Sequence, residues 1–256
     1  MEVRTRNAVW LGATIAVLMS VPAGVASAAA AGAARPVQRE DARRAEIHGG
    51  HDKSAAWMVA SYRELQVRKR TDKVTRELAI EIRAGGDVVS IALGASLTVT
   101  RGIAQVTVDS ADALRSLQDL LGTSSAVFAL RVMLSELEPV SVLDAPEMSL
   151  LSTAAFVASL VGDTGAPQRI ADRFVEKHRG LLRQVRLPSG NCWAAYSGET
   201  TAAWNDLQDC MDDASEREFF LAAYERIACN AVWLLRSESA WFEYLNCLSP
   251  LSGVSK

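Results

Sequence analysis

Four cysteines are the residues of this chain whose type and spacing point most directly to chemistry. They are Cys192, Cys210, Cys229 and Cys247, separated by 18, 19 and 18 positions. Zinc sites need close pairs of ligands that a turn can hold, and redox centres use a C-x-x-C motif, so these gaps favour neither a metal site nor disulfide exchange. An even number of cysteines in an exported chain instead indicates structural disulfides.

Helical geometry limits how the cysteines can pair. Eighteen residues make five helical turns, so Cys192 and Cys210 would share one stripe of a helix about 27 Å apart, as would Cys229 and Cys247. A disulfide needs α carbons within about 7 Å, so each bond must join two helices. We favour Cys192 with Cys229 and Cys210 with Cys247, because residues 211–228 carry a helical pattern of their own. A direct helical hairpin, which would pair Cys192 with Cys247 and Cys210 with Cys229, is the alternative.

The cysteine segment also repeats at an offset of 37 residues. Matching positions carry two cysteines and a tryptophan in each copy: Cys192 and Cys229, Trp204 and Trp241, Cys210 and Cys247. Such a pattern is typical of a duplicated unit. Aromatic side chains on small helices suit contacts with a partner, and Trp193 and Trp204 lie about 100 to 120° from the cysteine stripe. We therefore expect Trp193, Trp204 and Trp241 to form an interaction surface.

Other chemically active residues are sparse. His48 and His51 lie in a glycine-containing stretch, and His178 lies near the end of a predicted helix, where a positive charge would interact favourably with the helix dipole. We find no nucleophile elbow, zinc-protease motif, phosphate-binding glycine loop or dinucleotide fingerprint. We therefore expect no cofactor and no metal, and leave open a hydrolase that uses a pair of carboxylates.

Charge is uneven along the chain. Residues 35–76 contain 11 Arg or Lys against 6 Asp or Glu, whereas residues 192–247 contain 10 acidic against 3 basic residues. The basic segment, with Arg68, Lys69 and Arg70, could contact an acidic polymer or a membrane surface, or it could dock on the acidic module of the same chain. The chain as a whole is slightly acidic, so we expect no nucleic-acid partner.

The first 28 residues have the features of a secretory signal peptide. Arg4 and Arg6 precede an apolar run from Ala8 to Val21, and a small-residue sequence ends at Ala28, after which we predict cleavage. The apolar run is shorter than a membrane span, and no later segment is long and apolar enough to be one. We therefore expect a secreted or periplasmic protein with no transmembrane segment.

The remaining pattern predicts an α+β fold: a small antiparallel β-meander covered by helices, followed by a disulfide-stapled C-terminal helical module. Residues 29–55 resemble a flexible linker, and residues 57–71 give a weak helical pattern. Period-two alternation then predicts four strands within residues 76–108, and helical punctuation predicts helices over 110–185. A breaker at 187–190 predicts a boundary between an α+β domain at 56–187 and the cysteine module at 191–248.

Together these features favour a non-enzymatic exported protein that binds another macromolecule, such as a protein or an envelope component. The alternatives are an extracellular or periplasmic hydrolase that uses carboxylates and a secreted toxin or antagonist. The oligomeric state is not indicated by the sequence.

Overall fold

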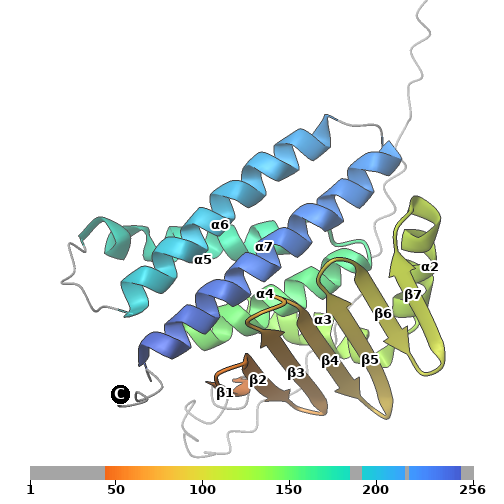
Figure 1. Ribbon diagram of the computed structural model, residues 1–256, viewed down its shortest axis with the longest axis horizontal. Coiled ribbons are helices and arrows are strands. Elements are labelled where there is room, and N and C mark those ends of the chain that lie inside the picture. Colours follow the sequence, from red (N-terminus) through yellow and green to blue (C-terminus); the bar gives the residue numbers. More distant parts are fainter. Residues whose placement is uncertain (1–43, 185–191, 217–218, 249–256) are drawn as a thin grey trace, which may run out of the picture. The chain divides into compact units, whose positions relative to one another are not determined.

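The computed structural model describes residues 44–184, 192–216 and 219–248 (Figure 1). The signal peptide expected at 1–28, most of the linker expected at 29–55 and the breaker at 187–190 lie outside the described residues.

A seven-stranded antiparallel sheet forms the first half of the described chain. The strands are β1 Glu46–His51, β2 Ala55–Tyr62, β3 Leu65–Asp72, β4 Leu78–Ala84, β5 Asp87–Leu93, β6 Leu97–Arg101 and β7 Ala104–Val108. Each strand pairs with the next along the chain, so the sheet is an uninterrupted meander. The predicted strands within 76–108 are confirmed as β4 to β7.

Three further strands correct the sequence prediction. The helix expected at 57–71 is wrong, because this stretch forms β2 and β3, and the end of the expected linker forms β1. Met58, Ala60 and Tyr62 are buried at alternate positions of β2, which is the period of a strand. The pattern was hidden because Trp57 and Val59, also apolar, occupy the opposite face of the same strand.

Tight turns fix the register of the hairpins. The turn between β4 and β5 contains Gly85 and Gly86, which both have positive φ, at 56° and 84°. Positive φ at two consecutive residues is the conformation whose twist matches antiparallel strands, and glycine adopts it without a steric penalty. β4 and β5 are therefore joined by a two-residue hairpin turn.

In the described residues, six helices follow the sheet: α2 Ala111–Gly122, α3 Ser125–Leu137, α4 Ala145–Leu160, α5 Ala166–Gln184, α6 Cys192–Ser215 and α7 Phe219–Leu248. The side chains of Ser110, Ser124 and Asp144 cap α2, α3 and α4 by accepting hydrogen bonds from backbone N–H groups of the first turn. The first four helices confirm the helical prediction for residues 110–185.

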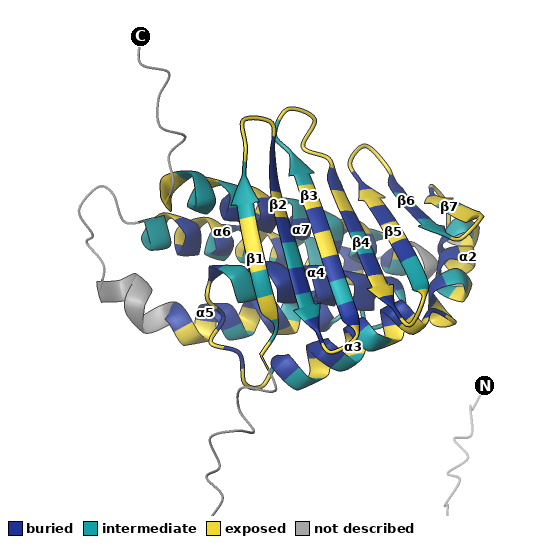
Figure 2. Cartoon of the chain, turned by 90° about the horizontal axis from the view of Figure 1, so that it is seen from below, coloured by how far each residue is buried: buried dark blue, intermediate teal, exposed yellow. Residues whose placement is uncertain are grey.

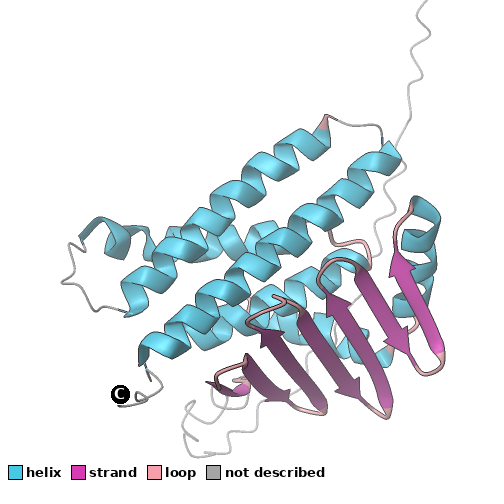
Figure 3. Ribbon diagram, viewed as in Figure 1, coloured by secondary structure: helices cyan, strands magenta, loops and turns pink. Residues whose placement is uncertain are grey.

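The helices lie on one face of the sheet, so the fold is α+β, and α5 and α6 pack on other helices rather than on the strands (Figure 3). α4 is buried along almost its whole length, and it packs against α3, α5 and α7. α7 also contacts β1, while α6 packs on α7 and α5. The boundary predicted near residue 187 stays a prediction, because it falls within residues 185–191, outside the described part of the chain.

The two disulfides join α6 to α7 at both ends of a helical hairpin. Cys192 is bonded to Cys247 and Cys210 to Cys229, with α carbons 5.6 and 5.8 Å apart. The disulfide-stapled module is therefore present, but the favoured pairing is wrong and the alternative is right. Residues 211–228 form no separate helix, because their first part ends α6 and their last part begins α7.

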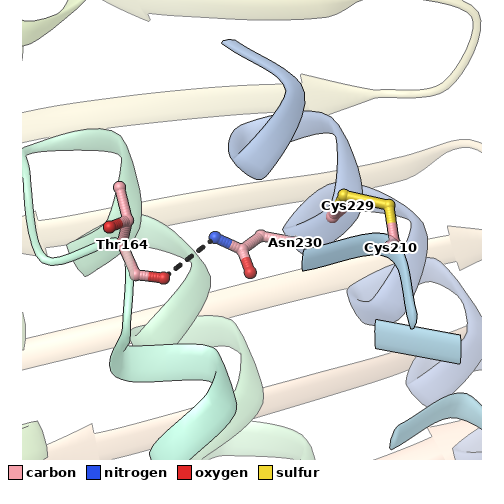
Figure 4. The surroundings of a disulfide bond; sticks show 4 residues. All are labelled: Thr164, Cys210, Cys229 and Asn230. Carbon is pink, nitrogen blue, oxygen red and sulfur yellow. Dashed lines mark hydrogen bonds between the residues drawn. A yellow bond between two sulfur atoms is a disulfide. The ribbon is translucent and has the colours of Figure 1, made fainter. Parts of the chain in front are cut away.

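The Cys210–Cys229 bond lies beside a contact that ties the hairpin to the rest of the fold (Figure 4). Asn230 is completely buried, and its side-chain amide donates a hydrogen bond of 3.4 Å to the carbonyl oxygen of Thr164, in the loop between α4 and α5. The hairpin is thus anchored within the protein as well as crosslinked to itself.

Within the described residues, no single helix has the length and apolarity needed to cross a bilayer, although residues 112–122 and 125–137, bent by 82°, meet these two criteria as a pair.

Candidate functional site

None of the described helices covers the second face of the sheet. Figure 2 looks directly onto this face, with the helices behind the strands. Side chains of a strand alternate between the two faces, so the sequence Arg68-Lys69-Arg70 in β3 divides between them. Arg68 and Arg70 are exposed on the bare face, whereas Lys69 is only 4% exposed and points into the core.

Lys69 is neutralised inside the protein. Its ammonium group is paired with the carboxylate of Glu238 on α7, and it donates hydrogen bonds to Ser149 and Thr153 on α4. Burial lowers the pKa of Lys69, and the charge of Glu238 acts in the opposite direction. The side chains of Lys69 and Glu238 are each only 1% exposed, so we regard this cluster as part of the core.

The bare face contains a shallow groove with a floor of small side chains. Strand register aligns Trp57, Arg70, Ala79, Ala92 and Thr98 in one row across β2 to β6. Alanine at the two central positions leaves a depression of about 550 Å³ between the larger groups on either side. A second depression of about 390 Å³ continues it toward the turn between β5 and β6.

Trp57 forms the wall of the groove next to β1. Its indole is 42% exposed and lies against the backbone of Gly50, where a Cβ atom would be 2.7 Å from the ring. Glycine at this position therefore lets the indole lie close to the neighbouring strand. A large, partly exposed aromatic ring next to arginine side chains is a typical feature of ligand-binding surfaces.

Arg70 is free to bind a ligand, whereas Arg68 and the carboxylates near the groove already have partners. Glu81 accepts two hydrogen bonds from Arg83, at 2.8 and 2.9 Å, and is 4.0 Å from Arg68. The hydrogen bonds from Arg83 lower the pKa of Glu81, and the charge of Arg68 makes a smaller contribution in the same direction. Arg70 forms no ion pair with any described residue.

A similar arrangement holds the carboxylate at the end of β3. Asp72 accepts hydrogen bonds from the backbone N–H groups of Val74 and Thr75, at 2.8 and 3.0 Å. These bonds lower its pKa, with a smaller contribution from Arg70. The two bonds also fix the turn that follows β3, at the edge of the second depression.

The tryptophans expected to form an interaction surface lie in different environments. Trp241 is only 3% exposed and stacks on Tyr244 inside the core, so it belongs to no surface. Trp193 is half-buried and packs against Tyr244 and His178. Trp204 donates a hydrogen bond of 2.7 Å from its indole nitrogen to Asp172 on α5. The structure therefore does not bring the three side chains together as one exposed patch.

The expected role of His178 is also corrected. α5 continues beyond it, and the imidazole is buried against Phe174 and Trp193, with Nε2 3.3 Å from the carbonyl oxygen of Leu143. Burial lowers its pKa, because the charged form would lose its hydration. Its Nδ1 has no hydrogen-bond partner, so a proton there would be unsatisfied. His178 is a neutral packing residue and not a cation at a helix end.

The groove itself was missed by the sequence analysis. The prediction of a helix at 57–71 would have placed Arg68 and Arg70 on nearly opposite sides of that helix. The signal for a strand was that Leu65, Val67 and Lys69 alternate with polar residues. Because lysine is charged, its presence at an inward position made the alternation of apolar and polar residues appear to end there.

The described residues contain no group of three or more histidine, cysteine, aspartate or glutamate side chains that could hold a metal ion. Comparison of the chain with protein-family models, with curated proteins and with solved structures found no match.

Proposed function

We propose that this protein is an exported binding protein that holds an acidic polysaccharide in the groove on the bare face of its sheet. The observation that carries the proposal is the pair of exposed guanidinium groups of Arg68 and Arg70 beside the exposed indole of Trp57. The two disulfides fit an extracellular or otherwise oxidising compartment, where such polymers occur.

The chemistry of the groove matches the two parts of such a ligand. An arginine side chain can bind a carboxylate, sulfate or phosphate group through two parallel hydrogen bonds. An indole offers a flat apolar surface to the ring of a sugar, and Ser90, Thr98 and Thr100 offer hydroxyl groups to its hydroxyls. The groove is open and shallow, which suits a segment of a polymer better than a small molecule that must be enclosed.

The arrangement supports binding more than catalysis. Glycoside hydrolysis usually needs two carboxyl groups on opposite sides of the bond that is cleaved. In the larger depression, Glu81 is the only carboxylate among the described lining residues, and it is bonded to Arg83. A hydrolase that uses paired carboxylates is therefore not favoured in the larger depression.

Calorimetric titration with oligogalacturonate, an acidic oligosaccharide, tests the proposal. We expect binding that weakens between 50 and 200 mM NaCl, and a loss of about tenfold or more in Arg68→Ala and Arg70→Ala, since a hydrogen bond to a charged group contributes about 1.5–3 kcal/mol. Trp57→Ala should weaken binding to a comparable extent. Arg115→Ala, on α2, is the control for a loss of one positive charge and should bind normally.

Two comparison ligands test whether the groove selects an acidic polysaccharide. A neutral oligosaccharide of the same length should bind at least tenfold more weakly, because it lacks groups for the arginines. A single-stranded oligonucleotide that bound more tightly than oligogalacturonate would overturn the choice of a polysaccharide. Equal affinity of the wild type and the Arg70→Ala variant for oligogalacturonate would overturn the proposed groove.

A further inference from the structure

A separate cavity of about 330 Å³ lies between the start of β1 and the loop that joins α3 to α4. We propose that it binds an apolar α-amino acid. Its apolar wall consists of aliphatic side chains from β1, α3, α4 and the loop: Ile47, Leu137, Val140, Val142, Leu150 and Leu151. Its size is at the lower end of the range for small-molecule sites, which suits a compact ligand.

The loop that closes the cavity is held in place by a dense set of hydrogen bonds. One carboxylate oxygen of Glu147 accepts hydrogen bonds from the hydroxyl of Ser141 and the backbone N–H of Leu143, at 2.7 and 2.8 Å. Arg173 and Lys177 both donate to the carbonyl oxygen of Ser141, at 3.0 and 3.2 Å. The cavity wall is therefore formed before any ligand arrives.

This loop also stores backbone strain and exposes apolar groups. Leu143 has a φ of 55°, a conformation that leucine rarely adopts, although its side chain is completely buried. Strain of this kind persists only where the surroundings enforce it, and it is concentrated at ligand sites and active sites. Val140 and Val142 are 55% and 49% exposed, so the braced loop leaves two apolar side chains in solvent beside an apolar cavity.

Two charges of opposite sign select the ligand. The lining includes Arg44 and Glu147. Arg44 forms no ion pair with any described residue, and the second carboxylate oxygen of Glu147 accepts no hydrogen bond from one. A simple carboxylic acid would be repelled by Glu147, and a simple amine would be repelled by Arg44. A free amino acid carries both charges and, with an aliphatic or aromatic side chain, also fills the apolar part.

Titration with ligands that carry both charges or only one, and with variants that lack one charged side chain, tests this site in the full oxidised protein. We expect L-leucine or L-phenylalanine to bind in a calorimetric titration. N-acetyl-leucine and leucinamide, which each lack one charge, should bind at least tenfold more weakly. Arg44→Gln and Glu147→Gln should also lose at least tenfold in affinity for the free amino acid, and glutamine at 147 keeps an oxygen that can accept the bonds of the loop.

Other outcomes would refute the site. One is that neither amino acid binds detectably at millimolar concentration. Another is that N-acetyl-leucine or leucinamide binds as tightly as leucine. A third is that Arg44→Gln and Glu147→Gln both keep the wild-type affinity for the free amino acid. The Arg70→Ala variant separates this inference from the proposed polysaccharide groove, because it should lose oligogalacturonate binding and keep the affinity for leucine. A thermal unfolding curve for each variant checks that the fold is intact.

Discussion

Replacement of Glu238 by glutamine should destabilise the protein strongly. The side chains of Lys69 and Glu238 are each 1% exposed, so neither charge can be hydrated if its partner is lost. The remaining partners of the lysine ammonium would all be neutral: the oxygens of Ser149 and Thr153 and the oxygen of the introduced amide. Breaking a buried ion pair by removal of one partner costs about 3–5 kcal/mol, and we expect Glu238→Gln to fall in this range.

A double-mutant cycle separates the interaction energy of Lys69 with Glu238 from the effects of packing around them. Lys69→Met should also cost about 3–5 kcal/mol, because it leaves a buried carboxylate. The double variant Lys69→Met/Glu238→Gln should lie within about 2 kcal/mol of the wild type or above it, since no charge is then buried. The coupling energy should therefore be at least about 3 kcal/mol.

Guanidinium-induced unfolding of the oxidised protein measures these free energies. Glu243→Gln, at an exposed position of the same helix, is the matched control and should change the stability by less than about 0.5 kcal/mol. A cost below about 1 kcal/mol for Glu238→Gln, or additive effects of the two single changes, would show that the charges are hydrated or unpaired in solution.

Three further predictions concern the core and the hairpin. The pKa of His178 is lowered from 6.5 in the folded protein, so its neutral form stabilises the fold above pH 6.5. This contribution should be lost as the pH falls through the lower pKa of the folded state. His178→Leu should therefore flatten that part of a plot of unfolding free energy against pH. Gly49→Ala should cost about 1–3 kcal/mol in denaturant unfolding, because its Cβ would lie 2.9 Å from a buried indole, whereas Gly122→Ala, with no atom within 4 Å, should cost nothing. Replacement of both Cys210 and Cys229, which are 19 residues apart, with serine should lower the free energy of unfolding by about 3 kcal/mol in the chain-entropy model. In the wild-type protein, non-reducing peptide mapping should recover these two cysteines in one crosslinked pair.

Much of the α+β architecture could be predicted from local pattern. β4 to β7 alternate regularly between apolar and polar residues, and glycine occupies the turns between them. α2, α3 and α4 each begin at a side chain that can cap a helix. These features are encoded within a few neighbouring residues, so a single sequence is enough to recognise them.

The disulfide pairing could be narrowed but not decided in the same way. Helical spacing correctly excluded a bond within either helix. The choice between the two remaining pairings depended on whether residues 211–228 fold as a third helix or as the ends of two longer ones. Their amphipathic pattern is compatible with both, and it is the packing of α7 on α4 and β1 that favours one long helix.

The candidate sites depend on contacts that the sequence does not display. Arg68 and Arg70 are notable only because their neighbour Lys69 points inward to Glu238, which lies 169 positions away. Trp57 lies at the groove because β1 places a glycine beside it. Both facts follow from strand pairing and not from local composition.

The indole N–H signals in a nuclear magnetic resonance spectrum of protein labelled at tryptophan with ¹⁵N test the central claim most directly. On addition of oligogalacturonate, the signal of Trp57 should shift while those of Trp193, Trp204 and Trp241 remain in place, because Trp57 is the only described tryptophan at the groove. A shift of Trp204 or Trp193 with no change at Trp57 would place the ligand on the helical hairpin and contradict the account.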